Sequence, residues 1–549
     1  ALAKNKDREN NWRKWLADEA FLDSLSLQKK AEIMEVGSLI ETWIKSGIND
    51  TVQILFEKII YSPPIFKYMS ASGETFHYLK SISTFFNFIK DQTDKHTQLK
   101  LTDILRIVDR MNEHDLALQM NRIDKTGDGI QLMTAHGSKG LEFDHVIIIG
   151  ANSKKWEEAR APSGKFSFPD TIVVTNNENK IEDERRLFYV CMTRARKEVL
   201  ITYSEKLLDG KSAAPSRFVI ETEKSGVTRP WMFNSSTAEK EKFLFSQFAP
   251  IQLPIKGWPP QIDEIIQSMT WNITGVNKYL TCPITFYYEN ILRAPSARSA
   301  PMGYGNAIHD TLEAIFNAYN SSQDDVFPSL EHTLSLFSVF MEKYHSHFTP
   351  TQYGNYVENG KIKLTAYYNH HIDEWKALKG SLAEHKVSNV EVGGIPVSGL
   401  YDRADFINDE LVVVDYKTGS SIYGIKKMAG PAKNIDELQV QLSQQNDPDE
   451  RDKIRLKIQG GDYWRQLVFY KLLAGVDPKI SKPFRNTYIS FIESDDSPKL
   501  YRKELTVTPD DEAIVLQQLK DVHAKVQRKE FSDGCGRSRC QWCNLTGSI

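Results

Sequence analysis

The sequence predicts a multidomain α/β protein in which an all-helical segment precedes two α/β units. At 549 residues the chain exceeds what one hydrophobic core usually holds, so three or more domains are expected. Apolar residues recur three or four positions apart through residues 1–127, whereas short β-type runs mixed with helix-like stretches begin at residue 128. Repeated prolines in residues 206–262 indicate a connector, and a second α/β unit occupies residues 263–549.

The composition is that of an ordinary globular protein, with 40% hydrophobic and 26% charged residues and a net charge of −3. Its longest apolar runs, such as VIIIG at 146–150, are far shorter than a membrane span. The polar start ALAKNKDRENNWRKW does not look like a signal peptide, so we expect a cytoplasmic protein that does not contact membranes. The near-neutral charge neither favours nor excludes nucleic acid as a partner.

The helical period of residues 1–127 is clearest in AEIMEVGSLIETWI (31–44) and LTDILRIVDRM (101–111). In residues 128–205 we expect strands at GIQLMT (129–134), HVIIIG (145–150), TIVV (171–174) and VLITY (199–203), with a helix over 182–197. In the last unit, the polar stretch 419–461 is long enough to be a mobile loop.

Two acids and a lysine stand at the ends of neighbouring predicted strands. LVVVDYKTG (411–419) ends an apolar strand with Asp415 and Lys417 on one face, and GLYDRADF (399–406) carries Asp402 on the preceding strand. A hairpin through FINDE would bring the two carboxylates together, where they repel unless a cation lies between them. Mg²⁺ prefers such ligands, and a nearby lysine can polarise water or neutralise a phosphate. A structural ion pair is the alternative interpretation.

These stretches, together with GNAIH (305–309) and QLVFY (466–470), resemble the RecB-type nucleases of the PD-(D/E)XK superfamily over residues 263–549. The resemblance implies that Mg²⁺ or Mn²⁺ is held by His309, Asp402, Asp415 and the backbone carbonyl of Tyr416. It implies that Lys417 is catalytic with the two aspartates. Gln466 and Tyr470, on one helical face, would support the catalytic site and the DNA strand. Taken singly, His309 also suits a core position, and Gln466 and Tyr470 an ordinary amphipathic helix.

Four of the five cysteines flank the last unit, with Cys282 near its start and Cys535, Cys540 and Cys543 near its end. This arrangement resembles the iron-sulfur RecB-type nucleases, in which a 4Fe-4S cluster joins the two ends of the domain. The family spacing C-x2-C-x5-C would place the last ligand at Ile549, so Cys535 would have to substitute for it. Structural zinc and buried free thiols are the alternatives.

A second resemblance covers the first α/β unit. IQLMTAHGSKGLEF (130–143) and EDERRLFYVCMTRARKEVLITYS (182–204) resemble motifs V and VI of UvrD/Rep-like superfamily 1 helicases. The resemblance makes residues 1–127 a helicase insertion-like helical domain and residues 128–205 a partial RecA-like domain. It implies that Thr134 and His136 lie near single-stranded DNA, that Glu142 contacts the nucleotide, and that Arg194 reaches its γ-phosphate.

A working helicase motor also needs a phosphate loop, G-x4-G-K-[ST]. The sequence has G-K-S only at Gly210–Ser212, with Glu205 where the first glycine belongs. We therefore expect the C-terminal part of an ATP-dependent helicase-nuclease of the AddAB or AdnAB kind, which uses ATP only with its motor half. It would process DNA ends in recombination or repair and favour single strands, with a second helicase-nuclease subunit as a candidate partner. A non-catalytic DNA-binding or scaffold subunit, and a freestanding nuclease with a relic helicase half, are the alternatives.

Overall fold

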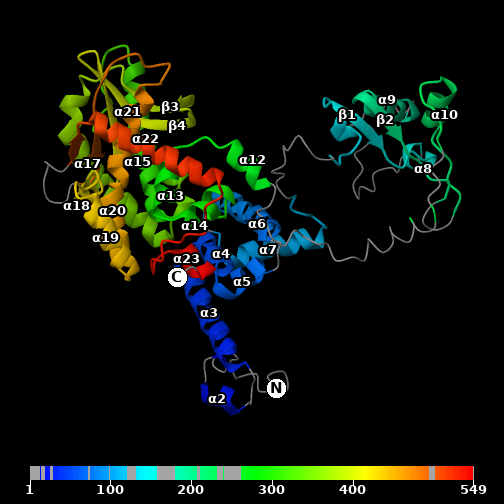
Figure 1. Ribbon diagram of the computed structural model, residues 1–549, viewed down its shortest axis with the longest axis horizontal. Coiled ribbons are helices and arrows are strands. Elements are labelled where there is room, and N and C mark those ends of the chain that lie inside the picture. Colours follow the sequence, from blue (N-terminus) through cyan, green and yellow to red (C-terminus); the bar gives the residue numbers. More distant parts are fainter. Residues whose placement is uncertain are drawn as a thin grey trace. The chain divides into compact units, whose positions relative to one another are not determined.

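The computed structural model divides the chain into two compact units, one formed by residues 1–123 with 253–549 and the other by residues 124–252. Figure 1 shows the elements in sequence colours. The described residues are 19–24, 29–71, 75–97, 99–119, 131–157, 180–206, 211–231, 261–493 and 501–547, with the single positions 13, 16, 236 and 239.

The first part of the larger unit is helical, as the sequence predicts. Its helices are α2 (Glu19–Ser24), α3 (Lys30–Asn49), α4 (Val52–Ile60), α5 (Pro63–Ala71), α6 (Thr75–Lys95) and α7 (Leu101–Glu113). The side chain of Thr51 accepts a hydrogen bond from Ile54 N and so starts α4. Val52, Ile89 and Ile104 form a buried cluster between these helices.

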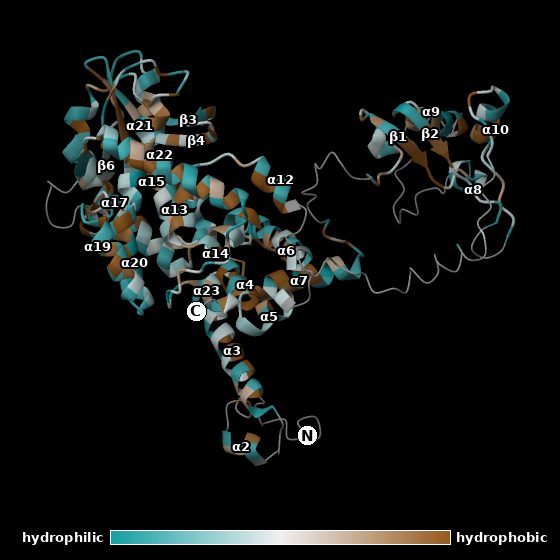
Figure 2. Ribbon diagram, in the orientation of Figure 1, coloured by the Kyte–Doolittle hydropathy of each residue, from teal (hydrophilic) through white to brown (hydrophobic). Residues whose placement is uncertain are grey.

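The smaller unit is built on two parallel strands, β1 (Phe143–Ile148) and β2 (Ala195–Ile201). Helices α8 (Ser153–Trp156) and α9 (Lys180–Met192) lie between them in sequence. The C-terminal halves of both strands are hydrophobic (Figure 2). Ile148, Phe188 and Cys191 are buried together, so Cys191, the one cysteine apart from the last unit, is a core residue here.

Two sequence-based expectations for this unit need comment. Residues 131–134 of GIQLMT form no strand. In the described part of this unit the sheet consists of β1 and β2, and residues 131–134 do not pair with either strand. TIVV lies outside the described residues. Part of the expected connector is structured: α10 (Arg217–Lys224) buries Phe218 and Val219 in the core of the smaller unit.

The rest of the larger unit surrounds a five-stranded mixed sheet in the order β3-β4-β5-β6-β7. The strands are β3 (Leu382–Val392), β4 (Ile395–Ile407), β5 (Glu410–Lys417), β6 (Phe484–Phe491) and β7 (Arg502–Leu505). β5 and β6 are parallel and the other neighbours antiparallel. Asn408 and Asp409 connect β4 to β5 with φ values of 52° and 67°, as a two-residue type I′ hairpin requires. The predicted hairpin is therefore present.

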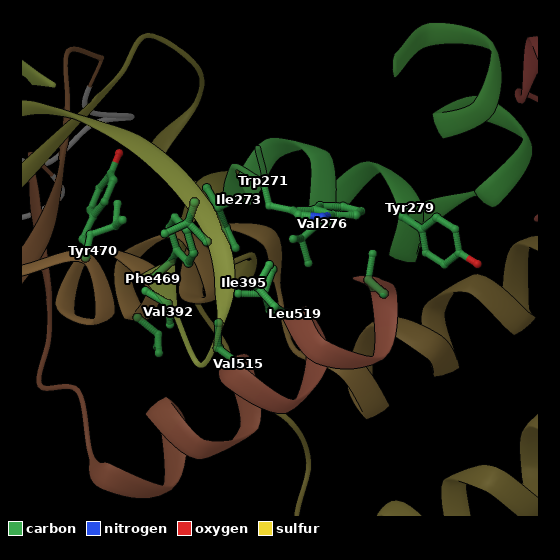
Figure 3. Close-up of a cluster of buried hydrophobic side chains, with 14 of the residues drawn as sticks. Trp271, Ile273, Val276, Tyr279, Val392, Ile395, Phe469, Tyr470, Val515 and Leu519 are labelled. Carbon is green, nitrogen blue, oxygen red and sulfur yellow. The ribbon is translucent and has the colours of Figure 1, made fainter. Parts of the chain in front are cut away.

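Helices cover both faces of this sheet, and β5 shows the alternation. Leu411 and Val413 join a hydrophobic cluster with α13 (Ile273–Thr281), α21 (Asp462–Ala474) and α22 (Pro509–Gln527) (Figure 3). Val412 and Val414 join a second cluster with α15 (Ala300–Ser321), α16 (Leu330–Lys343) and α17 (Pro350–Trp375). Because successive side chains of a strand point to opposite faces, Asp415 continues the α21 face of β5.

The stretch expected as a mobile loop contains three helices, α18 (Ser421–Lys426), α19 (Ile435–Gln444) and α20 (Pro448–Gln459). The side chain of Asp447 accepts hydrogen bonds from Asp449 N and Glu450 N at the start of α20, and Leu438 of α19 is buried. The expectation of a loop at 419–461 was wrong. The segment is polar, but side-chain capping and the burial of residues such as Leu438 stabilise helices in it.

Short elements complete the larger unit: α12 (Gln261–Gln267), α14 (Pro283–Phe286), the π-helix η4 (Tyr287–Ile291), the 3-10 helix η5 (His345–His347) and α23 (Gln541–Thr546). The N-terminal helices contact this region directly. Tyr61 donates to the carbonyl of Pro295 at 2.7 Å, and Arg298 pairs with Asp94 at 2.6 Å. Within the described residues, no helix combines the length and hydropathy needed to cross a bilayer.

Candidate active site and cysteine cluster

A group of one histidine and two acids lies where α15, β3 and β4 meet. His309 Nδ1 is 3.6 Å from Asp402 Oδ2 and 3.7 Å from Glu384 Oε1. The possible ligand atoms of the three residues all lie within 4.8 Å of one another. Glu384 stands opposite Asp402, between the paired positions Ala383–Arg403 and His385–Tyr401. Its φ of 48° departs from strand geometry, a kind of strain that often occurs at functional sites.

A second group of side chains surrounds Asp415 and adjoins the group of His309, Glu384 and Asp402. Asp415 itself is buried. Lys417 Nζ lies 2.6 Å from Asp415 Oδ2. Gln466 Nε2 and the Tyr470 hydroxyl donate to the other oxygen, Oδ1, at 2.7 and 2.8 Å. The four-residue spacing of Gln466 and Tyr470 on α21 places both side chains toward this one carboxylate.

The two groups are joined where β4 and β5 separate. Their ladder extends to the pair Arg403–Val414, and the next contact is a hydrogen bond from Tyr416 N to Asp402 Oδ2 at 2.7 Å. The side chain of Asp402 thus takes the place of a backbone acceptor. Asp402 and Asp415 are thus linked through Tyr416 at the point where the hairpin opens, and His309 and Glu384 adjoin Asp402 there.

The electrostatics of the site favour a bound cation. Burial would lower the pKa of His309, but Asp402, Glu384 and Asp415 outweigh it and raise that pKa to about 9. Burial raises the pKa of Asp402 to about 6, assisted by Asp415 and opposed by His309. Burial alone would lower the pKa of Lys417, but Asp415 and Asp402 outweigh it, so that the pKa is raised. The donor set of one imidazole and hard carboxylate oxygens, with its excess negative charge, fits a divalent metal ion.

A buried polar network lies behind these residues. Arg403 forms two 2.8 Å bonds to Asp405 and donates to the hydroxyls of Tyr416 and Tyr488 at 2.5 and 2.9 Å. Its guanidinium carbon lies 4.6 Å from the centre of the Phe316 ring. All three nitrogens of the guanidinium donate, so this network fixes the side chain of Tyr416 on the α15 face while the site forms at its backbone.

The structure therefore brings together all the nuclease-site residues that the sequence singled out, and adds Glu384. The signal for Glu384 was weak: it is one acid in LAEHKV, and only the β3–β4 register places it beside Asp402. Arg403 and Asp405 were also missed, although both stand within the quoted GLYDRADF stretch.

In the smaller unit, the helicase-type residues lie on two adjoining loops. Arg194 donates to the carbonyls of Val190 and Leu141 at 3.0 and 3.2 Å, so its side chain lies beside the exposed Glu142. Thr134 and His136 are both exposed, and the Thr134 hydroxyl accepts from Gly137 N at 3.1 Å. The structure thus pairs the motif V and motif VI residues within this unit.

The four flanking cysteines converge. Cys543 Sγ lies 3.6 Å from Cys282 Sγ and 3.7 Å from Cys535 Sγ, and Cys540 Sγ is 3.9 Å from Cys282 Sγ. All four sulfurs lie within 4.8 Å of one another. The hydrogen bond from Cys540, acting against burial, lowers the pKa of Cys282 to about 4. A buried set of four thiols, one of them readily ionised, can hold a metal centre.

Aromatic side chains from distant parts of the chain wall this cysteine cluster. Trp542 stacks on Tyr288 with ring centres 4.4 Å apart, and its ring meets the edges of Tyr61 and Phe66 at 4.9 and 6.0 Å. Tyr61 follows α4 and Phe66 belongs to α5. The cysteine cluster therefore lies at the contact between the N-terminal helices and the sheet-containing region.

Two family models match the chain. The PD-(D/E)XK nuclease superfamily model matches residues 270–547, and the UvrD-like helicase C-terminal domain model matches residues 23–206. The chain belongs to the PD-(D/E)XK nuclease superfamily, whose domain implies a hydrolytic nuclease. That domain follows a UvrD-like helicase C-terminal region, so the predicted family and the predicted mixed α/β fold class are both confirmed.

Several curated relatives carry the names of DNA helicases. "ATP-dependent DNA helicase Rep" of Buchnera aphidicola subsp. Schizaphis graminum is 36% identical over 192 residues, 33% of this chain and 27% of the relative. "ATP-dependent DNA helicase PcrA" of Staphylococcus epidermidis is 26% identical over 240 residues, 42% of this chain and 30% of the relative. "DNA helicase II" of Rickettsia typhi is 26% identical over 222 residues, 39% of this chain and 30% of the relative. The chain thus spans less than a third of the length of each.

Proposed function

We propose that the chain is a Mg²⁺- or Mn²⁺-dependent DNA nuclease that favours single strands. The observation that carries this proposal is the group His309, Glu384 and Asp402 beside the Asp415–Lys417 pair, inside a PD-(D/E)XK domain. We propose further that it forms the C-terminal part of an ATP-dependent helicase-nuclease that processes DNA ends in recombination or repair. The UvrD-like region supports this wider role.

His309, Glu384, Asp402, Asp415 and the backbone carbonyl of Tyr416 would hold the metal ion. Once bound, a divalent ion lowers the pKa of a water molecule and offsets charge on the phosphate. Lys417 holds a positive charge 2.6 Å from Asp415, where it can meet a phosphate oxygen. Gln466 and Tyr470 both donate to Asp415 Oδ1, so they fix the rotation of that carboxylate and leave Oδ2 to face Lys417.

The helicase-type residues would act together with a nucleotide-binding half that this chain does not supply. Arg194 donates to the carbonyl of Leu141, the neighbour of Glu142, which supports a shared nucleotide contact for these two residues. The exposed Thr134 and His136 would meet single-stranded DNA. A second helicase-nuclease subunit is part of this proposal. Under it, ATP binds only when the phosphate loop is present.

For the cysteine cluster we propose a structural metal centre. The resemblance to iron-sulfur nucleases makes a 4Fe-4S cluster the first candidate. One observation favours zinc as the second: a single tetrahedral ion with Zn–S bonds of about 2.3 Å keeps its sulfurs roughly 3.8 Å apart. The three Sγ pairs described above are 3.6–3.9 Å apart. A 4Fe-4S cube would hold the sulfurs further apart.

Cleavage of a labelled single-stranded oligonucleotide tests the nuclease. We expect cutting with Mg²⁺ or Mn²⁺ and none with EDTA, and the variants Asp415→Asn and Lys417→Ala should lose it while keeping the wild-type melting temperature within a few degrees. Asp373→Asn is the control, because Asp373 is an exposed acid on α17. Wild-type activity in either site variant would refute the assignment. DNA binding by wild-type protein without cutting under any metal would favour a scaffold role.

Anaerobic purification with metal analysis tests the cysteine cluster. A brown protein with iron and sulfide supports the 4Fe-4S cluster, whereas a colourless protein with one zinc per chain supports zinc. Cys282→Ala should remove the metal, and Cys191→Ala, which changes a core cysteine of the smaller unit, should not. A chain without metal at these sulfurs would contradict both candidates.

A further inference from the structure

A pocket of about 540 Å³ opens between α18, α20 and α21, in the segment that the sequence suggested was a loop. Its walls carry six cationic side chains and two acids, Asp452 and Asp462. The cations are Lys426, Lys427, Arg455, Lys457, Arg465 and Arg537. In a chain with a net charge of −3, this excess of positive charge is local. Such a concentration of one sign attracts anions.

The two acids do not neutralise the pocket. Asp452 pairs with Arg537 at 3.2 Å, and Asp462 lies 3.6 Å from Arg465. No described carboxylate forms an ion pair with Lys426, Lys427 or Lys457, all three of which are exposed. These lysines have both the charge and the freedom to meet an incoming anion.

The floor of the pocket is rigid, because Arg465 is buried and firmly held. It donates to Asn277 at 2.5 Å and Gln518 at 2.7 Å, and to the carbonyls of Gln459 and Gly460 at 3.0 Å each. Burial lowers its pKa to about 10, so it keeps its charge at neutral pH. A charge that is fixed before the ligand arrives costs little ordering on binding.

The pocket adjoins the candidate active site through one aromatic ring. Lys417 Nζ lies 5.3 Å from the centre of the Tyr463 ring, and Lys427 Nζ lies 5.1 Å from the same centre. Tyr463 is therefore shared by the catalytic lysine and a pocket lysine. Proteins that bind single strands combine a basic groove with aromatic rings on which bases stack.

We propose that this pocket binds the backbone phosphates of the DNA strand on one side of the phosphate that is cut. The proposal rests on the nuclease function proposed above and adds the path of the strand, past Tyr463 and along α18 and α20. A free nucleotide or inorganic phosphate offers the same anionic chemistry. Continuity with Lys417 favours the strand, because a strand seated in the active site must continue beyond it.

The test measures the affinity of the full chain for a labelled oligo-dT of about 12 nucleotides by fluorescence anisotropy. EDTA is present to prevent cutting. We expect Lys457→Glu to weaken binding several-fold and Lys427→Glu with Lys457→Glu to weaken it about tenfold. The slope of log K against log salt should fall by about 0.7 for each lysine. Lys503→Glu is the matched control, since Lys503 is an exposed lysine on the edge strand β7, and it should change affinity less than twofold.

A second assay separates this proposal from the nuclease function. Hydrolysis of bis(p-nitrophenyl) phosphate with Mn²⁺ needs only the active site, so the pocket variants should keep the wild-type rate. If the wild type hydrolyses neither this ester nor DNA, the nuclease proposal fails while anisotropy still reports on the pocket. Unchanged oligo-dT affinity and salt slope in the pocket variants would overturn the strand path. So would displacement of oligo-dT by thymidine monophosphate or inorganic phosphate at equal concentration.

Discussion

Glu384 is the residue that most changes the picture of the site, because it adds a carboxylate from β3 to the proposed metal ligands His309 and Asp402. We predict that Glu384→Gln weakens Mn²⁺ binding by tenfold or more, since the amide lacks the charge and one acceptor oxygen of the acid. Isothermal titration of the protein with Mn²⁺ measures this.

Glu391→Gln removes an exposed acid from the same strand and serves as the control for Glu384→Gln. It should leave the Mn²⁺ affinity unchanged. Equal affinities for Glu384→Gln and the wild type would exclude Glu384 from the ligand set.

At this scale the sequence was informative where residues are close along the chain. Asp402 and Asp415 were paired from a short hairpin, and the structure joins them through the bond from Tyr416 N to Asp402. Gln466 and Tyr470 follow helical spacing in the same way. Glu384 could not be predicted from spacing along the chain. Its place opposite Asp402 depends on the register between β3 and β4, which the alternation of side chains alone does not determine.

Among the elements, the junction of α18 and α21 shapes both the pocket and the site. Gly461 precedes α21, and a Cβ there would lie 2.0 Å from the carbonyl oxygen of Lys427. That oxygen accepts from Tyr463 N and Trp464 N at 3.2 and 3.1 Å, so it caps the helix in place of a side chain. No sequence pattern predicts this cap, because the accepting carbonyl is a backbone group far from the helix along the chain, and the polarity of 419–461 suggested a loop instead.

We predict that Gly461→Ala lowers the free energy of unfolding by about 1–3 kcal/mol, because the new methyl group forces the two backbones apart. It should also lower DNA cleavage, since Gln466 and Tyr470 move with α21. Urea denaturation and a cleavage assay measure the two effects.

Gly475→Ala provides a comparison at the other end of α21. Its φ is −67° and the nearest atom to an added Cβ is 3.5 Å away, so it should be nearly neutral. Equal destabilisation by both changes would mean that the close approach at Gly461 has no special importance.

On the scale of the whole molecule, the N-terminal helices share one compact unit with the nuclease sheet, although residues 124–252 separate them in sequence. No local pattern predicts such a contact. His347 of η5 lies in it, near Arg298, Lys90 and Asp94, and is only 4% exposed. Burial, reinforced by Arg298 and Lys90 and opposed by Asp94, lowers the pKa of His347 to about 4.

This shift predicts a loss of stability in acid. Between pH 6.5 and 4 the unfolded chain takes up a proton at His347 that the folded chain refuses, so stability falls as the pH drops through this window. Between pH 7.5 and pH 5 the loss attributable to His347 should be on the order of 2 kcal/mol. Urea denaturation at pH 7.5 and pH 5 should show a smaller difference for His347→Gln than for the wild type.

His332→Gln, which changes an exposed histidine of α16, should keep the wild-type difference between the two pH values. If His347→Gln also shows the wild-type difference in stability between pH 7.5 and pH 5, the acid sensitivity arises from other groups.

The closure of the cysteine cluster also has a consequence for synthesis. Cys282 and Cys543 are 261 positions apart, and at roughly 5–20 residues per second the ribosome needs about 13–50 s to travel that distance. For most of this interval the thiol of Cys282 has none of its three sulfur neighbours, while the residues that form the hairpin and α21 are being synthesised. A nascent chain can therefore complete the strands β3, β4 and β5 well before its cysteines meet, and Cys282 has to stay reduced until they do.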